Sequence, residues 1–357
     1  MGRPAPVRVA VRHSRRPPRP RSRHPRIRGL GRREADVPET LTADLVHRFR
    51  AMASDITVRI IDPSEEAPGA ITRVEGIFSS VERSCSRFDP TSDLMRANAQ
   101  PGEWTNVDAA CLGAIETAYL AYELTAGAFD PRVLSSLTAL GYDRSLNFGA
   151  GDVVTQATDA IGPLHAPWAL AIDAPRGRVR LGADPIDLGG IGKGYAVRLA
   201  IAELAGMGRA ALVEAGGDLA TFGDGPDRAP GETRGWRAAV EDPRGGSEPM
   251  AVLDVTDASA ATSSIRLRRW TAGDRDVHHI IDPRTGRSAD SGLLAVTVIG
   301  EDTVWAEVWT KALFLSGIDD IRVHAEDAGL AAYWMDAQGG RGATESMQAR
   351  VLWEGAA

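Results

Sequence analysis

The chain has 357 residues, 43% hydrophobic and 25% charged, the balance of an ordinary globular protein with a sizeable core. Its formal net charge of -7 is uneven, because residues 1–33 hold 12 arginines and no acid, whereas the remainder holds 29 basic and 48 acidic residues. The acidic body argues against nucleic acid as the main partner, and no run approaches the roughly 18 apolar residues of a membrane span.

The chain starts with an Arg- and Pro-rich head that has no hydrophobic periodicity. We therefore predict that residues 1–42 are disordered and that residues 43–357 form the folded domain. We interpret the head as a solvated tail or an incorrectly assigned start; a nucleic-acid-binding arm is the alternative. It shows no apolar signal stretch, no twin-arginine signal and no lipobox cysteine, so we expect a cytoplasmic protein.

The first elements of the domain are a strand and two helices. Residues 52–60 end in alternating apolar and polar residues, which predicts a strand. Helices are predicted over 69–85 and 107–126. We expect Cys85 and Cys111, which fall in these helices, to be small buried apolar side chains, because two cysteines make neither a disulfide framework nor a metal-ligand set.

The second half of the chain mixes strands with helices. Residues 169–181 predict a hairpin that turns at a Pro-Arg-Gly sequence. Residues 194–207 predict an amphipathic helix, 302–316 the most apolar helix of the chain, and the Pro- and Gly-rich stretch 223–235 a loop. Further strands are predicted over 210–214, 236–241, 251–255 and 293–299. A regular βαβ repeat is missing, which favours an α+β fold over a doubly wound sheet.

A glycine-rich motif lies between a strand end and a helix. Residues 186–196 read Ile-Asp-Leu-Gly-Gly-Ile-Gly-Lys-Gly-Tyr-Ala. Glycines let the backbone approach a ligand closely and a helix N-terminus favours phosphate, so the motif indicates a phosphate site to which Lys193 adds a positive charge. Asp187 and Gly194 stand where a Walker A motif requires Gly and Ser or Thr. The alternative is a structural turn, which needs neither Asp187 nor Lys193.

Lysine is scarce in this chain. It has 39 arginines but only two lysines, Lys193 and Lys311. A chain so biased toward Arg keeps Lys by chance, or where a compact ammonium is needed and a guanidinium does not fit. Both lysines fall inside dense motifs, which favours the second interpretation.

The glycine-rich motif resembles the signature of the ApbE family, in which Asp-Leu-Gly-Gly is followed by Lys-Gly-Tyr-Ala. Further motifs of that family occur in its order over residues 49–317. They are Met52-Ala53-Ser54, Ser86-Arg87-Phe88-Asp89-Pro90 with Asn98, Gly127-Ala128-Phe129-Asp130-Pro131, Glu214-Ala215-Gly216-Gly217-Asp218, Ala261-Thr262-Ser263, His279-Ile280-Ile281-Asp282-Pro283-Arg284-Thr285-Gly286 and Ala306-Glu307. Seven motifs in order make coincidence a poor explanation.

The resemblance implies a fold and an activity. The fold is a single compact α+β domain, related to the T-fold, with mixed and antiparallel sheets packed against helices. The activity is that of an FAD:protein FMN transferase, which moves FMN from FAD to a Ser or Thr hydroxyl of an acceptor flavoprotein as a phosphoester and releases AMP. FAD would be the substrate, and the acceptor protein the partner.

The resemblance also carries residues over. The positions that match the family's flavin contacts are Met52, Phe88, Ala128, Phe129, Asp130, Asp187, Lys193 and Ile280. Met52 and Phe88 suit flat rings, with core packing as the alternative. The two aspartates suit ligand N–H or hydroxyl groups, with a turn or helix cap as the alternative. The catalytic candidates are Lys193 and His279, a histidine that can take a proton from the incoming hydroxyl; its neighbour His278 is the weaker candidate.

The sequence departs from the family at the metal position. Family members bind Mg²⁺ through a backbone oxygen, here of Gly190, and through an Asp and a Thr one helical turn apart, which are Glu307 and Lys311 here. Mg²⁺ prefers oxygen ligands, whereas Lys311 is a cation. Our hypothesis is that its ammonium replaces the ion; the alternative is an ordinary surface pair at i,i+4 spacing. Ser264, where the family usually has Gly, is a second departure.

Whether Mg²⁺ is still used therefore stays open, and so do two other functions. One is an FAD-binding protein that has lost transfer, because the metal position is altered. The other is an FAD diphosphatase that hydrolyses FAD to FMN and AMP with water as the acceptor.

Overall fold

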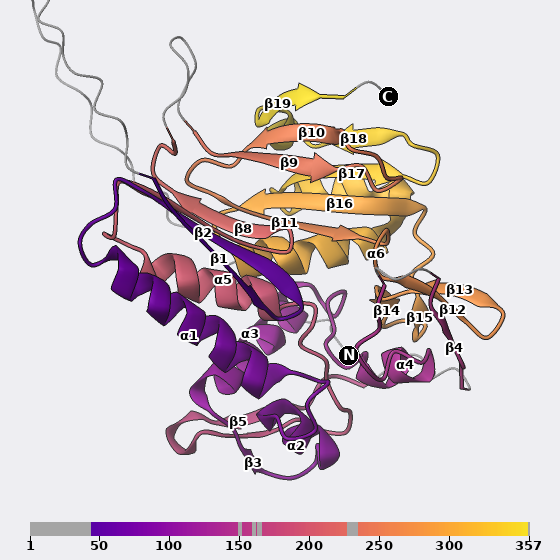
Figure 1. Cartoon of the computed structure of the whole chain (residues 1–357). Coiled ribbons are helices and arrows are strands. Elements are labelled where there is room, and N and C mark those ends of the chain that lie inside the picture. Colours follow the sequence, from indigo (N-terminus) through magenta and orange to yellow (C-terminus); the bar gives the residue numbers. More distant parts are fainter. Residues whose placement is uncertain (1–43, 149–151, 159–161, 163–165, 227–234, 356–357) are drawn as a thin grey trace, which may run out of the picture. The chain divides into compact units, whose positions relative to one another are not determined.

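The computed structural model describes residues 44–148, 152–158, 162, 166–226 and 235–355. The predicted head and most of the predicted loop at 223–235 lie outside these residues. An eight-stranded sheet organises the described part (Figure 1), in the order β1-β2-β7-β8-β11-β16-β17-β18. Its strands are β1 (Asp44–Ala51), β2 (Ser54–Ile61), β7 (Ala210–Ala215), β8 (Asp218–Phe222), β11 (Ser259–Ser264), β16 (Leu293–Gly300), β17 (Ala331–Asp336) and β18 (Arg341–Ala343). All neighbours pair antiparallel, which confirms the α+β class.

Three long helices cover one face of this sheet (Figure 1). They are α1 (Ala67–Cys85), α5 (Gly192–Glu203) and α6 (Thr303–Asp327). Alternate residues of β2, Ile56, Val58 and Ile60, are fully buried in a core cluster with Val74 and Phe78 of α1. Each such side chain contributes about 1.5–3 kcal/mol when it leaves water. The alternation in β2 therefore determines which face of the sheet the helices cover.

A second, smaller sheet covers the opposite face. It has the order β19-β10-β9, with β9 (Arg237–Glu241), β10 (Pro249–Asp254) and β19 (Val351–Glu354). Met250 and Leu253 of this sheet pack against Ile299 and Tyr333 of the large sheet in a separate core cluster. Both faces of the central sheet are therefore covered, one by helices and the other by the smaller sheet.

The other described elements are short, except for α3. They are α2 (Asp93–Ala99), β3 (Thr105–Asn106), α3 (Ala109–Leu124), α4 (Leu134–Ala139), β4 (Val154–Thr155), β5 (Ala171–Asp173), β6 (Arg178–Arg180), β12 (Arg269–Ala272), β13 (Arg275–His278), β14 (Ile281–Asp282), β15 (Arg287–Ser288) and α7 (Glu345–Gln348). The predicted hairpin is the β5–β6 pair, and its turn ends at Gly177, whose φ of 57° is left-handed. None of the described helices is long and apolar enough to cross a membrane.

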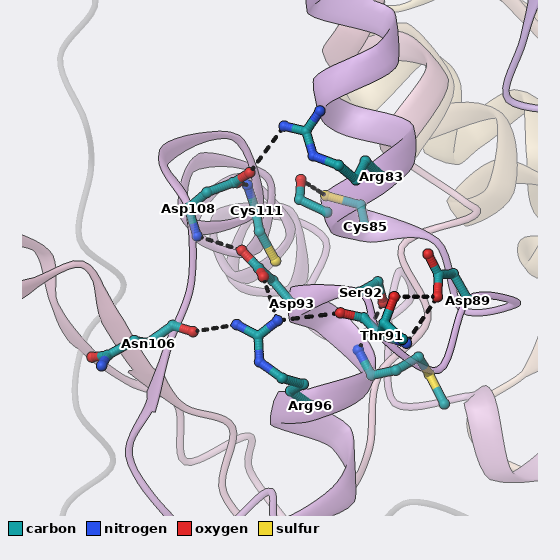
Figure 2. A network of polar contacts seen from close by, with 12 residues as sticks. Arg83, Cys85, Asp89, Thr91, Ser92, Asp93, Arg96, Asn106, Asp108 and Cys111 are labelled. Carbon is teal, nitrogen blue, oxygen red and sulfur yellow. Dashed lines mark hydrogen bonds and ion pairs between the residues drawn. The ribbon is translucent and has the colours of Figure 1, made fainter.

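Polar contacts fix the segment between α1 and α3 (Figure 2). The Ser92 hydroxyl caps α2 by accepting from the Met95 amide at 3.1 Å. Arg96 donates to the Asn106 carbonyl at 2.9 Å, and the carboxylate of Asp93, the first residue of α2, accepts from the amide of the residue that caps α3. These bonds hold α2 against β3 and the N-terminal end of α3.

Most predicted elements are present. The predictions at 52–60, 69–85 and 107–126 correspond to β2, α1 and α3, and both cysteines are free and buried in α1 and α3, as expected (Figure 2). Two predictions were wrong in detail. The helix predicted over 194–207 begins at Gly192, ends at Glu203 and is not amphipathic, because it packs between α1, α6 and the sheet.

The helix predicted over 302–316 was too short. It continues to Asp327, since the chain passes through a kink at Gly317, with a left-handed φ of 81°, and then resumes helical geometry. Its N-terminus is fixed by Asp302, whose carboxylate accepts from the Val304 amide at 2.8 Å. The same carboxylate pairs with Arg198 of α5 at 2.7 Å. This ion pair ties the middle of α5 to the N-terminus of α6.

Candidate functional site

Two lysines and two carboxylates from three elements form a charged cluster. Lys193, near the start of α5, contacts Asp218 at the start of β8, and its Nζ lies 3.6 Å from Glu307 Oε1 on α6. Lys311 Nζ donates to the backbone carbonyl of Glu307 at 3.1 Å and to its Oε1 at 3.3 Å. The carboxylate side chains are 2% and 3% exposed, the lysine side chains 15% and 18%. The ammonium groups therefore lie on the solvent side of buried carboxylates.

Burial disfavours every charge of this cluster, and attraction between the lysines and the carboxylates offsets that cost. Burial alone would lower the pKa of Lys193, but Asp218 and Glu307 outweigh it and the pKa is raised. Burial, with the nearby Glu307, raises the pKa of Asp218 to about 6 against the attraction of the lysines. Burial would also raise the pKa of Glu307, yet Lys193 and Lys311 lower it. Burial lowers the pKa of Lys311, partly offset by Glu307.

Glycines of the 186–196 motif allow the close approach of α5 to α6. A Cβ on Gly194 would lie 2.9 Å from Glu307 Oε2 and 3.0 Å from the Thr303 carbonyl oxygen. In its absence, the Gly194 amide donates to Glu307 Oε2 at 2.9 Å. A Cβ on Gly190 would lie 3.1 Å from Cε of Lys311. The backbone at Gly190 and the Lys311 side chain are therefore in contact, which brings together all three residues at the family's metal position.

The cluster does not fit a magnesium ion. One oxygen of Glu307 accepts from the Gly194 amide and the other lies beside both ammonium groups. An oxygen of Asp218 contacts Lys193. Among the described residues, no group of three or more His, Cys, Asp or Glu side chains is arranged to hold a metal ion. Since Mg²⁺ requires several oxygen ligands in octahedral geometry, the two lysines leave it too few.

Met52 lies in a strained turn beside the glycine-rich motif. It connects β1 to β2 together with Ala53, and both residues have left-handed φ values, 51° and 57°. Residues other than Gly, Asn and Asp seldom adopt this conformation, and such strain concentrates at functional sites. Cε of Met52 lies 3.4 Å from a Cβ built on Gly192. The turn thus holds a thioether at the start of α5, partly packed against the main core cluster, and its role as a flavin contact stays a prediction.

Phe88 presents an aromatic ring to solvent. It is 42% exposed, which argues against the core-packing alternative. The Arg87 guanidinium lies over the rings of both Phe88 and Tyr142, 4.2 Å from each centroid. Arg87 also lies 3.7 Å from Asp187, whose other oxygen accepts from the Gly189 amide at 2.8 Å. Asp187 therefore shapes the glycine-rich turn and links it to the aromatic pair.

The 128–130 segment divides into two roles. Phe129 is buried and its ring lies 3.3 Å from a Cβ built on Gly190, next to the charged cluster. The Asp130 carboxylate accepts from Arg132 through both oxygens, with both side chains less than 5% exposed. Oδ1 also accepts from the Arg132 amide at 2.9 Å, which is the turn alternative for Asp130, and its role as a ligand acceptor stays a prediction. Ala128, half-buried, donates its amide to the Thr125 carbonyl.

His279 is held as a neutral base. Its Nδ1 lies 3.3 Å from the Arg268 carbonyl oxygen, which only accepts, so the proton lies on Nδ1 and Nε2 keeps its lone pair. Burial, with Arg268, His278 and Lys311 nearby, holds the pKa of His279 well below its usual value. His278 instead bonds the Ala289 carbonyl at 2.9 Å, a structural role. Ile280 is buried in the core under α6, which favours core packing over ligand contact.

Sequence reasoning missed two charged residues. Asp218 ends the Glu-Ala-Gly-Gly-Asp motif, but no role was predicted for it, although it is the partner of Lys193. Arg268 received none either. Its charge adds to burial in lowering the pKa of His279 and opposes the rise in the pKa of Lys193, and its guanidinium makes no hydrogen bond or ion pair with any described residue. The signal for Arg268 was its position between the Thr-Ser and His motifs, but four arginines crowd residues 266–275 and nothing in the sequence separates them.

Two hollows of the described surface lie elsewhere. One is lined by Leu134, Ser135 and Pro185 beside α4, and another by Ser136, Arg275 and neighbours from β13 and β15. Neither includes a residue of the charged cluster. The chemistry of the side chains, and not the shape of a cavity, therefore locates the site.

Comparison with known proteins identifies the family. The model of the ApbE family matches residues 52–334. The FAD:protein FMN transferase of Treponema pallidum is 27% identical over 268 residues, 72% of this chain and 74% of its own. That of Salmonella typhimurium is 26% identical over 333 residues, 85% and 88% of the two chains. The crystal structure of the ApbE protein of Thermotoga maritima matches with a TM-score of 0.69 at 26% identity, over 86% of this chain and 99% of its own. With a family match from the turn at Met52 to β17, this chain belongs to the ApbE family.

Proposed function

We propose that this protein is an FAD:protein FMN transferase, which moves FMN from FAD to a Ser or Thr hydroxyl of an acceptor flavoprotein. Family membership and similarity to the FMN transferases of Treponema pallidum and Salmonella typhimurium support the proposal. The observation that carries it is the geometry of His279, whose Nδ1 lies 3.3 Å from the Arg268 carbonyl oxygen and leaves Nε2 with its lone pair. Burial first, and then the charges of Arg268 and Lys311, lower the pKa of this histidine, and transfer to a hydroxyl needs a neutral base beside cations.

His279 acts as the base. Its Nε2 lone pair takes the proton of the acceptor hydroxyl as that oxygen forms a bond to the FMN phosphorus. The bond from this phosphorus to the bridging oxygen breaks, and AMP leaves with the electron pair. The acceptor then carries FMN as a phosphoester, and the proton taken by His279 returns to solvent. Its lowered pKa keeps the imidazole unprotonated before the reaction, as a base must be.

Cations of this chain stabilise the charge that develops on the diphosphate. Lys193 is fixed by Asp218 and Glu307 at the helix N-terminus of α5, where backbone amides also favour phosphate. Arg268 has no carboxylate partner among the described residues and is free to pair with phosphate oxygens, for which its planar guanidinium is well shaped. Both groups lower the cost of charge on the leaving AMP.

The flavin ring of FAD has candidate contacts on both sides of the glycine-rich turn. The exposed ring of Phe88 and the thioether of Met52 suit a flat ring system. Asp187 links the Phe88 side to the turn through its contacts with Arg87 and Gly189, whereas Met52 lies at the start of α5 beside Gly192. Ring contacts and cations thus flank one glycine-rich turn, as the ring and diphosphate parts of FAD require.

The test is incubation of the purified protein with FAD and an acceptor flavoprotein, read by acceptor mass and by AMP. We expect an added FMN and equimolar AMP. His279→Asn should reduce transfer by about a hundredfold or more while FAD still binds. His278→Asn, the matched control, should transfer FMN like the wild type. Arg268→Gln should weaken FAD binding and raise KM, while the exposed neighbour substitution Arg269→Gln should not.

Two other outcomes would contradict the proposal. Tight FAD binding without either product would identify an FAD-binding protein that has lost transfer. AMP and free FMN without a modified acceptor would identify an FAD diphosphatase.

A further inference from the structure

We infer that the site works without a divalent metal ion, and that the ammonium group of Lys311 supplies the positive charge at the diphosphate. The inference rests on the proposed function, and it is carried by the disagreement between this cluster and the metal position of the family. Its evidence is the position of Lys311, the balance of charge and the choice of side chain.

Lys311 occupies the space that a metal ion would need. Its Nζ is bonded to the Glu307 carbonyl oxygen at 3.1 Å and to Oε1 at 3.3 Å. Its Cε and Cδ lie 3.1 and 3.3 Å from a Cβ built on Gly190. The side chain therefore lies between the two remaining oxygen-bearing residues of the metal position and contacts both.

The charges are balanced without an ion. Two ammonium groups face the carboxylates of Asp218 and Glu307. A divalent cation would add two positive charges beside two ammonium groups and would find every Glu307 oxygen already in contact with a donor. Arg268, whose charge acts on Lys193 and whose guanidinium has no hydrogen bond or ion pair among the described residues, adds positive charge for a diphosphate and none for a metal.

The choice of lysine is informative in this chain. It has 39 arginines and two lysines, and both lysines belong to the charged cluster. With the Lys311 carbons packed on the Gly190 backbone and the buried ring of Phe129 beside them, the space suits a compact ammonium better than a planar guanidinium. An ordinary i,i+4 surface pair would show no such preference.

The experiment measures metal binding and transfer separately. Binding is followed through the electron paramagnetic resonance signal of free Mn²⁺, titrated with protein, with and without FAD, against FAD alone. Transfer is measured with Mg²⁺ or with EDTA. For the wild type we expect no Mn²⁺ bound by the protein and equal transfer rates in Mg²⁺ and EDTA.

Variants at Lys311 test the replacement. Lys311→Thr restores an oxygen donor, so it should bind Mn²⁺, lose about a hundredfold of its transfer rate in EDTA and recover in Mg²⁺. Lys311→Met should lose transfer in both conditions, because it supplies neither a charge nor an oxygen. The matched control is Arg322→Thr, which removes the cation of another i,i+4 pair on α6, 3.6 Å from Glu326, and should keep the wild-type pattern.

Stoichiometric Mn²⁺ binding by the wild type, or loss of its transfer in EDTA, would overturn the inference, and so would full transfer by Lys311→Met. The wild-type measurements need no variant to fold. If the wild type transfers no FMN in any condition, the proposed function fails, but the Mn²⁺ titration still decides whether this site holds a metal.

Discussion

Asp218 determines how the charged cluster responds to pH. It is the partner of Lys193, and its pKa of about 6 is raised above the ordinary 3.8 by burial, with Glu307 adding to the effect. The folded protein therefore keeps a proton on Asp218 at pH values where the unfolded chain has released it. The stability that this group contributes is fully present below about pH 4 and is lost as pH rises through about 6.

The Asp218→Asn substitution isolates this effect. Between about pH 5 and pH 7.5 the wild type should lose about 1.4 kcal/mol of stability relative to the variant, because about one pKa unit of the shift lies within this range. The measurement is urea unfolding of both proteins at the two pH values. His278 and His279, whose pKa values are lowered, act in the opposite direction over part of this range, but equally in both proteins, so they cancel in the difference. A pH-independent difference would show that Asp218 titrates normally.

At the scale of elements, the site depends on the contact between α5 and α6. Gly194→Ala should push these helices apart, because its Cβ would meet Glu307 Oε2 at 2.9 Å and the Thr303 carbonyl oxygen at 3.0 Å. We expect a loss of about 1–3 kcal/mol in the free energy of unfolding, measured in urea, and a slower transfer.

Gly76→Ala is the matched control in α1. Nothing lies within 4 Å of a Cβ at this exposed helix position, so the substitution should stabilise the protein by about 0.5–1 kcal/mol. If both alanine variants are equally stable, the contact at Gly194 is not the reason for its glycine.

Helices with a clear start and apolar spacing could be predicted from the sequence, but several strands could not. Helix α1 has a proline in its first turn, and α3 is capped by Asp108, both of which are local signals. Strand β11, Ser-Ala-Ala-Thr-Ser-Ser, has almost no β-branched or aromatic residue and forms only because β8 and β16 pair with it. Helix α6 continues beyond Gly317 because its residues on both sides of the kink pack in one core cluster.

The site could be predicted in its parts but not in its contacts. Motif spacing indicated Lys193 and the Glu307–Lys311 pair separately. That the two motifs meet depends on α5 and α6 packing on one face of the sheet, which joins residues more than a hundred positions apart. Whether Asp130 can accept a hydrogen bond from a ligand depends on its ion pair with Arg132, because Arg132 competes for the same carboxylate. Competing partners of this kind are decided by three-dimensional geometry, which a linear pattern does not contain.

At the scale of the whole molecule, two expectations from the sequence stay predictions: a cytoplasmic location and a folded domain that begins at residue 43. The second has a sharp structural test, because β1 starts at Asp44 and the family match starts at residue 52. The two starting points differ by one strand. Strand β1 pairs with β2 along its whole length, from Asp44 opposite Ile61 to Ala51 opposite Ser54.

Shortened chains that begin at residue 43 or at residue 52 should therefore behave differently. The chain 43–357 should keep the thermal unfolding midpoint and the FMN transfer rate of the full chain, since it retains β1 and the turn at Met52. The chain 52–357 should unfold at a lower temperature and transfer FMN poorly. It loses Phe49, which packs edge-on against Phe78 of α1 at 5.5 Å, exposes the edge of β2 and frees the strained turn that holds Met52. Both shortened chains are compared with the full chain by calorimetry and by the transfer assay. Equal behaviour of the two shortened chains would place the start of the domain at residue 52. If neither shortened chain folds, residues 1–42 contribute to folding.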